Sequence, residues 1–161
     1  MPEPAAGSEG ARARAFRLWR GMAAGLVAGL GAEYVLGMSA NFWFTVPSTH
    51  PGSHASNYFA GVVHVAWWAL RGGAAPMTLF RLHVTLGVLL GLGAAAALAA
   101  AVAARRPAGI WAAAVGLAGV AGAGFNGASF ANYGHDFSSL LMALAWLIAW
   151  IAYGLGLYAA R

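Results

Sequence analysis

The chain alternates long apolar runs with short polar connections. A helix needs about 20 apolar residues to cross a bilayer core, and we predict membrane spans at about 21–44, 84–104, 110–130 and 137–160. The apolar run 58–70 rises only roughly 20 Å at 1.5 Å per residue, against a core of about 30 Å. The pattern predicts an all-α transmembrane four-helix bundle, with one short interfacial or re-entrant helix on the outer side.

The amino-terminal segment differs from the rest of the chain. Residues 1–15 show no hydrophobic periodicity, so we expect a disordered cytoplasmic tail there. Residues 16–161 then form a single transmembrane domain. Asp136 directly precedes the last apolar run, and we expect its side chain to cap the amino terminus of that helix.

The composition excludes several classes of protein. Hydrophobic residues make up 61% of the chain and charged residues only 8%, against about 25% in an ordinary soluble domain. Too few charges remain to cover the surface of a water-soluble globule. The chain has no cysteine, which excludes disulfides, thiolate metal sites and cysteine nucleophiles.

The basic residues are all arginine, and their distribution predicts the orientation. With four spans, two arginines, Arg71 and Arg81, fall on one side. The other side carries Arg12, Arg14, Arg17, Arg20, Arg105, Arg106 and Arg161. The positive-inside rule then places both termini in the cytoplasm. The net charge of +5 records these loop arginines, so we expect no binding to nucleic acid.

Small residues recur every four positions in three of the predicted spans. In lipid, small residues at this spacing let helix backbones approach closely. We therefore expect helix-packing faces that contain Gly21, Gly25, Gly29, Gly87, Gly91 and Gly122.

A polar residue stands at the outer end of each row of small residues. Continuing the step of four leads to Glu33 and Asn41 in the first span, to His83 in the second and to Asn126 in the third. If these rows face the interior of the bundle, their polar ends meet in the outer leaflet. We predict a polar cluster of Glu33, Asn41, Asn126, Asn132 and Asp136 there.

The histidines lie on the same predicted side as this cluster. A neutral imidazole can ligate haem iron or a metal ion, so His64, His83 and His135 are candidate ligands for haem b or a metal, with Glu33 as a further metal ligand. The alternative is structural: Glu33 pairs with Arg81 or a histidine, and His83 bonds to a loop carbonyl. His50 and His54 flank a Pro-Gly turn and give only a weak metal signal.

Two segments, His50–Phe59 and Gly124–Leu140, carry a resemblance. Together with the surrounding apolar runs they resemble small four-helix multi-pass membrane proteins of GC-rich bacteria. The resemblance covers most of the chain after residue 16. The resemblance implies a location in the bacterial cytoplasmic (inner) membrane and a multi-pass helical fold, and it carries no activity.

Three functions are compatible with these patterns. The first is a non-catalytic membrane component or accessory subunit, partnered by the lipid bilayer and by a second copy of the chain or another membrane protein. The second is a redox protein that binds haem b or a metal ion. The third is a conduit for protons or small solutes that uses Glu33. The first is favoured, because close helix packing explains the glycine rows without any ligand.

Overall fold

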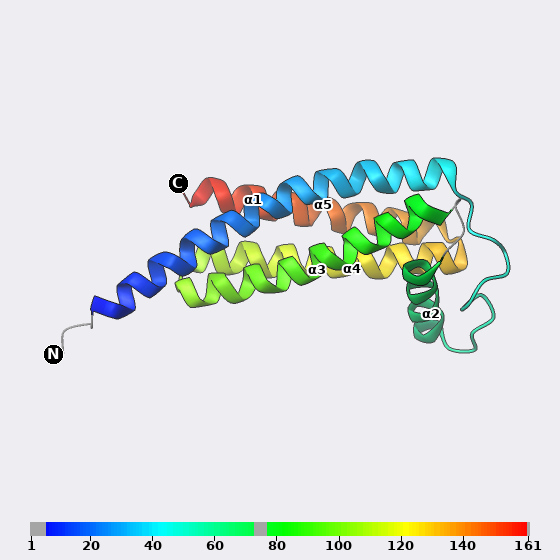
Figure 1. Cartoon of the computed structure of the whole chain (residues 1–161), viewed down its shortest axis with the longest axis horizontal. Helices are drawn as coiled ribbons and strands as arrows, with labels where there is room; N and C mark the ends of the chain where they lie inside the picture. The colour runs from blue at the N-terminus through cyan, green and yellow to red at the C-terminus, as the bar shows by residue number, and fades with distance from the viewer. Residues whose placement is uncertain (1–5, 73–76, 161) are drawn as a thin grey trace.

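The computed structural model describes residues 6–72 and 77–160, which fold entirely into helices and their connections. Five helices follow in order: α1 (Ala6–Trp43), α2 (Tyr58–Arg71), α3 (Thr78–Ala104), α4 (Pro107–Tyr133) and α5 (Asp136–Ala159). The four long helices run side by side in alternating directions, and α2 crosses one end of them (Figure 1).

Length and hydropathy separate α2 from the other helices. The helical segments Glu9–Trp43, Thr78–Ala104, Pro107–Tyr133 and Asp136–Ala159 are long and apolar enough to cross a membrane. The 14 residues of α2 rise about 21 Å, less than a bilayer core of about 30 Å. The structure therefore confirms the all-helical class with four candidate spans and one short helix.

The helix boundaries follow from local chemistry. Asn57 caps α2, because its side chain accepts a hydrogen bond from the backbone N–H of Ala60 at 3.1 Å. Pro107 opens α4 at a position that needs no N–H donor. Gly134 ends α4 with a φ of 67°, a left-handed conformation that glycine adopts at low cost.

Two sequence expectations are corrected here. Residues 6–15 form the first turns of α1, whereas a disordered tail was expected there. The segment 11–15 alternates alanine and arginine, both strong helix formers, which accounts for the extension. Residues 1–5 lie outside the described residues. Asp136 is the first residue of α5 and not its cap, because the N-cap is His135, which makes no side-chain capping hydrogen bond.

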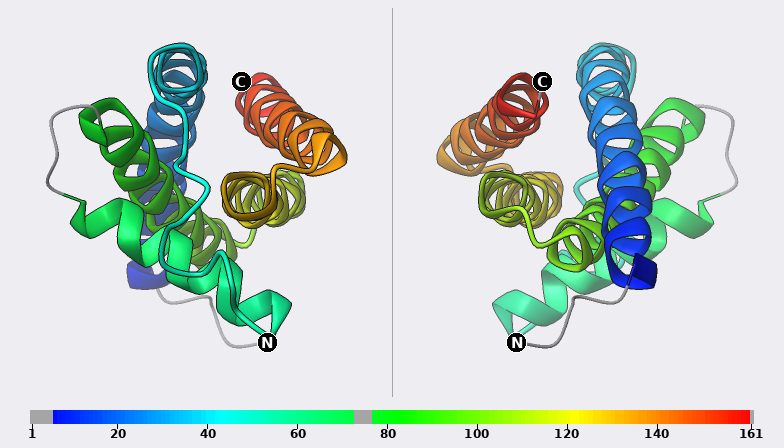
Figure 2. Two further views of the ribbon diagram at one scale, coloured as in Figure 1. Left: turned by 90° about the vertical axis from the view of Figure 1, so that its right-hand side faces the viewer. Right: turned by 90° about the vertical axis from the view of Figure 1, so that its left-hand side faces the viewer.

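The bundle is built from two tight helix pairs. Helix α1 packs mainly along α3, and α4 along α5, while α3 and α4 join the pairs (Figure 2). Between α1 and α5, the indole N–H groups of Trp146 and Trp150 donate to the carbonyl oxygens of Leu30 and Val27 at 3.0 and 3.2 Å. These two hydrogen bonds therefore join α1 to α5, which pack less closely than the helices within either tight pair.

The interior of the bundle is rich in alanine and contains only a few large side chains, while most large apolar side chains lie on the outside. The buried core contains many alanines around Trp19, Leu26, Leu30 and Tyr153. Large apolar side chains point outward along the long helices, among them Phe42, Leu92, Trp111 and Leu155. An exterior of this kind suits a lipid environment, because lipid chains solvate apolar side chains as well as a protein core does.

The glycines divide into two groups. Gly29 packs against Leu90, Gly87 against the Glu33 carboxylate and Gly122 against Ala145, so these three lie at contacts between helices. The other expected packing glycines have open space where a Cβ would stand, and so they make no close contact within the chain: Gly21, Gly25 and Gly91. The closest approaches occur elsewhere, at Gly116 against Tyr153 and at Gly119 against the backbone of α5.

We predict that Gly119→Ala weakens the α4–α5 pair. Its new Cβ would lie 2.7 Å from the carbonyl oxygen of Ala145 and 2.9 Å from the backbone nitrogen of Ala149, and backbone atoms do not rotate away. Overpacking of this kind costs about 1–3 kcal/mol, which unfolding of the purified protein in mixed detergent micelles would measure. Gly124→Ala is the matched control, since nothing lies within 4 Å of its Cβ. Equal stability of the two variants would contradict the prediction.

Candidate functional site

The first polar site is a contact between α1 and α3. Glu33 on α1 and His83 on α3 approach each other with Oε1 and Nδ1 2.9 Å apart. The Glu33 side chain is 11% exposed and that of His83 24%. The rows of small residues therefore end at this contact, and the predicted pairing of Glu33 with a histidine is the one that the structure shows.

Glycine on each helix makes room for the pair. A Cβ at Gly37 would lie 2.9 Å from Cε1 of His83, and a Cβ at Gly87 would lie 3.1 Å from Oε1 of Glu33. Each polar side chain thus rests on a glycine of the opposite helix. A larger residue at either glycine would push the pair apart.

The pair leaves hydrogen-bonding capacity unused. Among the described residues, neither the second carboxylate oxygen of Glu33, Oε2, nor Nδ1 of His83 has a hydrogen-bond partner of good geometry. The 2.9 Å approach is therefore an ion-pair distance without a well-aligned hydrogen bond. A buried acceptor without a partner costs about 1–3 kcal/mol, and it is the kind of atom that can take up a proton or a cation.

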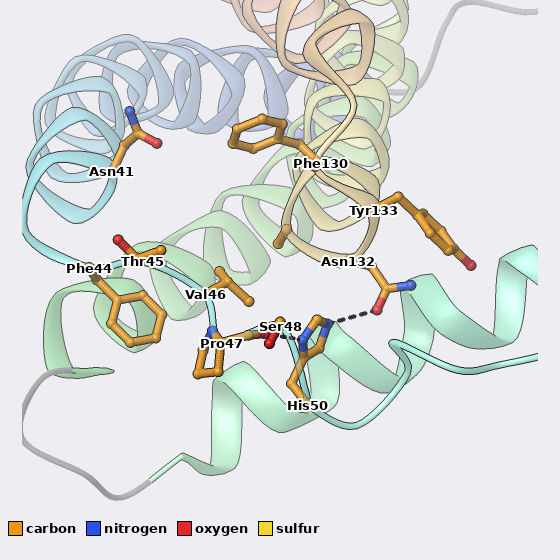
Figure 3. A pocket seen from close by; sticks show the side chains of 12 residues that line it. Asn41, Phe44, Thr45, Val46, Pro47, Ser48, His50, Phe130, Asn132 and Tyr133 are labelled. Carbon is orange, nitrogen blue, oxygen red and sulfur yellow. Dashed lines mark hydrogen bonds between the residues drawn. The ribbon is translucent and has the colours of Figure 1, made fainter.

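The second polar site is a pocket at the end of the bundle that α2 crosses, here called the α2 end (Figure 3). It has a volume of about 410 Å³ and lies between the end of α1, the connection after it and the end of α4. Its lining consists of uncharged polar, aromatic and small side chains with one histidine: Asn41, Phe44, Thr45, Val46, Pro47, Ser48, His50, Phe130, Ala131, Asn132, Tyr133 and Gly134.

His50 and Asn132 both line the pocket and contact each other (Figure 3). The His50 ring lies 2.7 Å from the carbonyl oxygen of Pro47 through Nδ1, and 3.0 Å from Oδ1 of Asn132 through Nε2. The amide nitrogen of Asn132 donates to the carbonyl oxygen of Gly52 at 3.3 Å. Both neighbours of the ring are oxygen acceptors, so these contacts fix the orientation of the imidazole in the pocket wall.

The loop before α2 is shaped by glycine and closed by an aromatic ring. Gly52 has a φ of 105°, a backbone conformation that only glycine adopts readily. A Cβ there would also lie 2.6 Å from the carbonyl oxygen of Gly61. Trp68 of α2 stacks on the His50 ring with 5.4 Å between the ring centroids. These contacts fix the loop against α2 and α4.

A buried hydroxyl network joins α2, α4 and α5 beside the pocket. Tyr58 of α2 bonds through its hydroxyl to Ser129 of α4, and Ser129 bonds to Ser138 of α5 at 3.1 Å. Tyr133 stacks on Tyr58 with 4.9 Å between centroids and donates to its carbonyl oxygen at 3.1 Å. The short helix is therefore anchored by specific polar bonds as well as by apolar contact.

The contacts of the other predicted site residues are with groups other than the Glu33–His83 pair. Asn126 donates to the carbonyl oxygen of Gly122 in its own helix at 2.8 Å. Asn41 and Asn132 line the pocket. His64 is exposed on α2, and His135 is exposed at the start of α5, where it stacks on Tyr133.

The arrangement gives no support to a site for haem b or a metal ion. Across residues 6–72 and 77–160, no three side chains of histidine, aspartate or glutamate gather closely enough to hold a metal ion. His64, His83 and His135, with Glu33, were the expected ligands, and only the Glu33–His83 contact forms.

His50 is the pocket residue for which the sequence gave the weakest indication. The segment His50-Pro51-Gly52-Ser53-His54 indicated a turn, and the structure forms one, with the Ser53 N–H bonded to the His50 carbonyl at 3.1 Å. The partner of His50 on α4, Asn132, lies far along the chain. No spacing rule connects the two.

Comparison of the chain with protein-family models, with curated proteins and with solved structures finds no match.

We predict an energetic coupling between Glu33 and His83. In a double-mutant cycle of Glu33→Ala and His83→Ala, the two effects on the free energy of unfolding should be non-additive by about 0.6–2 kcal/mol, the range of polar contacts between membrane helices. The control cycle pairs Glu33→Ala with Asn126→Ala, whose side chain bonds within its own helix. Additivity within about 0.5 kcal/mol is expected there, and additivity in both cycles would contradict the contact.

Proposed function

We propose that the chain is a multi-pass accessory component of the bacterial cytoplasmic membrane, with no catalytic role of its own. Its α2 end faces the outer side, and the pocket there receives an uncharged polar segment of a partner protein. The observation that carries this proposal is the pocket of about 410 Å³ between α1, α4 and the loop at residues 44–50.

The distribution of charge supports the orientation. Arginines of the described residues gather at the end opposite α2: Arg12, Arg14, Arg17, Arg20, Arg105 and Arg106. Arg71 and Arg81 lie at the α2 end. The positive-inside rule places the arginine-rich end in the cytoplasm, which puts the pocket and α2 on the outer face.

The lining of the pocket supports the class of partner. No arginine, lysine, aspartate or glutamate lines it, while amide, hydroxyl and aromatic groups do. Asn41 and Thr45 lie across the pocket from Phe130 (Figure 3). Such a lining suits hydrogen bonds to a peptide backbone together with aromatic contacts, as at the wet, polar parts of protein interfaces.

Single-cysteine labelling tests this proposal. The chain has no cysteine of its own, so an introduced cysteine is the only thiol that can react. Asn41→Cys should react with a membrane-impermeant maleimide in intact spheroplasts, and Arg14→Cys only after permeabilisation. A bound partner covers the pocket, so Asn41→Cys should react several-fold more slowly in native membranes than in purified protein. Ser56→Cys is the matched control, because Ser56 is exposed at the same end and does not line the pocket.

Two results would contradict parts of the proposal separately. Labelling of Arg14→Cys from outside would reverse the orientation. The labelling rate of Asn41→Cys divided by that of Ser56→Cys can be compared between native membranes and purified protein. If this ratio is the same in both, no partner covers the pocket in the membrane, and the accessory role is contradicted.

A second function, a proton-binding site within the membrane, is favoured by one observation. Glu33 is buried, and its Oε2 atom has no partner among the described residues. An ionisable group within a membrane helix defaults to a functional role when its burial costs free energy. The His83 imidazole at 2.9 Å supplies a second group that can exchange the proton.

We expect Glu33→Gln to abolish proton uptake in liposomes if this second function holds. The measurement is the pH change inside vesicles that contain the purified protein, under an imposed potassium diffusion potential. Asn126→Ala, which leaves both ionisable groups in place, should behave like the parent. Equal proton flux in the parent and in Glu33→Gln would eliminate the second function without affecting the first.

A further inference from the structure

A second pocket lies at the end of the bundle opposite α2, here called the arginine end. It has a volume of about 290 Å³ and lies between the first turns of α1 and the turn that joins α3 to α4. Its lining is Glu9, Arg12, Ala13, Phe16, Ala104, Arg105 and Arg106. It is therefore built by the helical extension that replaces the expected tail.

The pocket concentrates positive charge that the protein does not neutralise. Three arginines and one glutamate line it. Glu33–His83 is the single ion pair found among residues 6–72 and 77–160, so Arg12, Arg105 and Arg106 have no carboxylate within ion-pair distance there. Glu9 reduces the net charge of the lining but holds none of the guanidinium groups at that distance.

The local backbone and an aromatic ring hold the arginines in place. The Arg106 guanidinium lies over the Phe16 ring, 5.0 Å from its centroid. Arg105 ends α3 in the left-handed region with a φ of 55°, and Arg106 precedes α4 in extended backbone. No side chain caps α4, so the positive end of its dipole is also available to an anion at this turn.

We propose that this pocket binds the phosphate of an anionic phospholipid headgroup, such as that of phosphatidylglycerol. Guanidinium groups bind phosphate oxygens through paired hydrogen bonds, and basic pockets between helices at the cytoplasmic face bind anionic headgroups. Exposed Leu18 and Val102 on the adjoining helices offer apolar surface to the acyl chains. This inference rests on the membrane location and orientation proposed above.

Counting bound lipid on the purified protein by native mass spectrometry tests the site. The protein is titrated with phosphatidylglycerol and, separately, with phosphatidylcholine. R105Q/R106Q should weaken phosphatidylglycerol binding at least about tenfold, since each arginine at an anionic surface contributes roughly fivefold. R14Q/R17Q is the matched control: it removes the same charge from exposed positions of α1 that do not line the pocket. Solvent and salt screen such charges from a phosphate bound in the pocket, so its affinity should stay within about twofold of the parent.

A neutral substitution guards against an effect of folding or of net charge. Phe16→Leu keeps every charge and removes the ring under Arg106. It should lower phosphatidylglycerol binding by about threefold, within the range of an exposed cation–π contact, and leave the helical circular dichroism unchanged. Unchanged binding in both Phe16→Leu and R105Q/R106Q would overturn the site.

The remaining outcomes each decide one point. Equal losses in R105Q/R106Q and R14Q/R17Q would show a diffuse surface charge and overturn the pocket. Displacement of bound phosphatidylglycerol by millimolar inorganic phosphate would assign the pocket to a soluble anion and overturn the lipid. Recovery of the chain outside the carbonate-washed membrane fraction would refute the membrane location itself. If the protein is in the membrane fraction but binds no phosphatidylglycerol, only the headgroup site is refuted.

Discussion

Close approach between helix backbones is the constraint on which this structure depends. Inside lipid, apolar burial does not drive helices together, so contact depends on tight packing and polar bonds. The α4–α5 pair meets this requirement at Gly116 and Gly119, where α5 side chains and backbone occupy the space of a missing Cβ. The α1–α3 pair meets it at Gly37 and Gly87, and there the space is used by Glu33 and His83. The same device therefore produces an apolar seam in one pair and a polar contact in the other.

The polar groups at the two ends of the bundle differ in whether they have partners within the protein. At the α2 end, buried Ser129 and Asn132 are satisfied by protein partners, including Tyr58 and His50. That end is fixed by specific bonds around an uncharged pocket. At the arginine end, the guanidinium groups of Arg105 and Arg106 lack carboxylate partners within the described chain. An end closed by its own hydrogen bonds suits recognition of a shaped partner, and an end of unpaired cations suits an anionic surface.

Hydropathy was enough to predict the four long apolar helices, because a long apolar run has few alternatives to a buried or lipid-embedded helix. The step of four also brought Glu33 and His83 to one contact, since both belong to helices whose small residues face each other. Gly21, Gly25 and Gly91 make no such contact within the described chain, because a row of four drifts around the helix axis by about 40° per step. The His50–Asn132 bond had no such signal, because it depends on the path of a loop that Gly52 bends and Trp68 covers. Periodicity describes helix faces, and it does not describe loops.

Some buried polar atoms have no hydrogen-bond partner among the described residues, and they differ in how much apolar burial offsets the missing bond. The Trp19 indole nitrogen and the Tyr153 hydroxyl lack hydrogen bonds among the described residues. Each belongs to a large ring that fits against glycine, Trp19 at Gly109 and Tyr153 at Gly116, so apolar burial offsets the lost bond. Glu33 has little apolar surface to contribute, and its Oε2 atom is equally unsatisfied. Packing therefore accounts for the two aromatic residues but not for the acid. That difference separates Glu33 from the structural core, because its second carboxylate oxygen is buried with neither a hydrogen bond among the described residues nor a large apolar surface beside it.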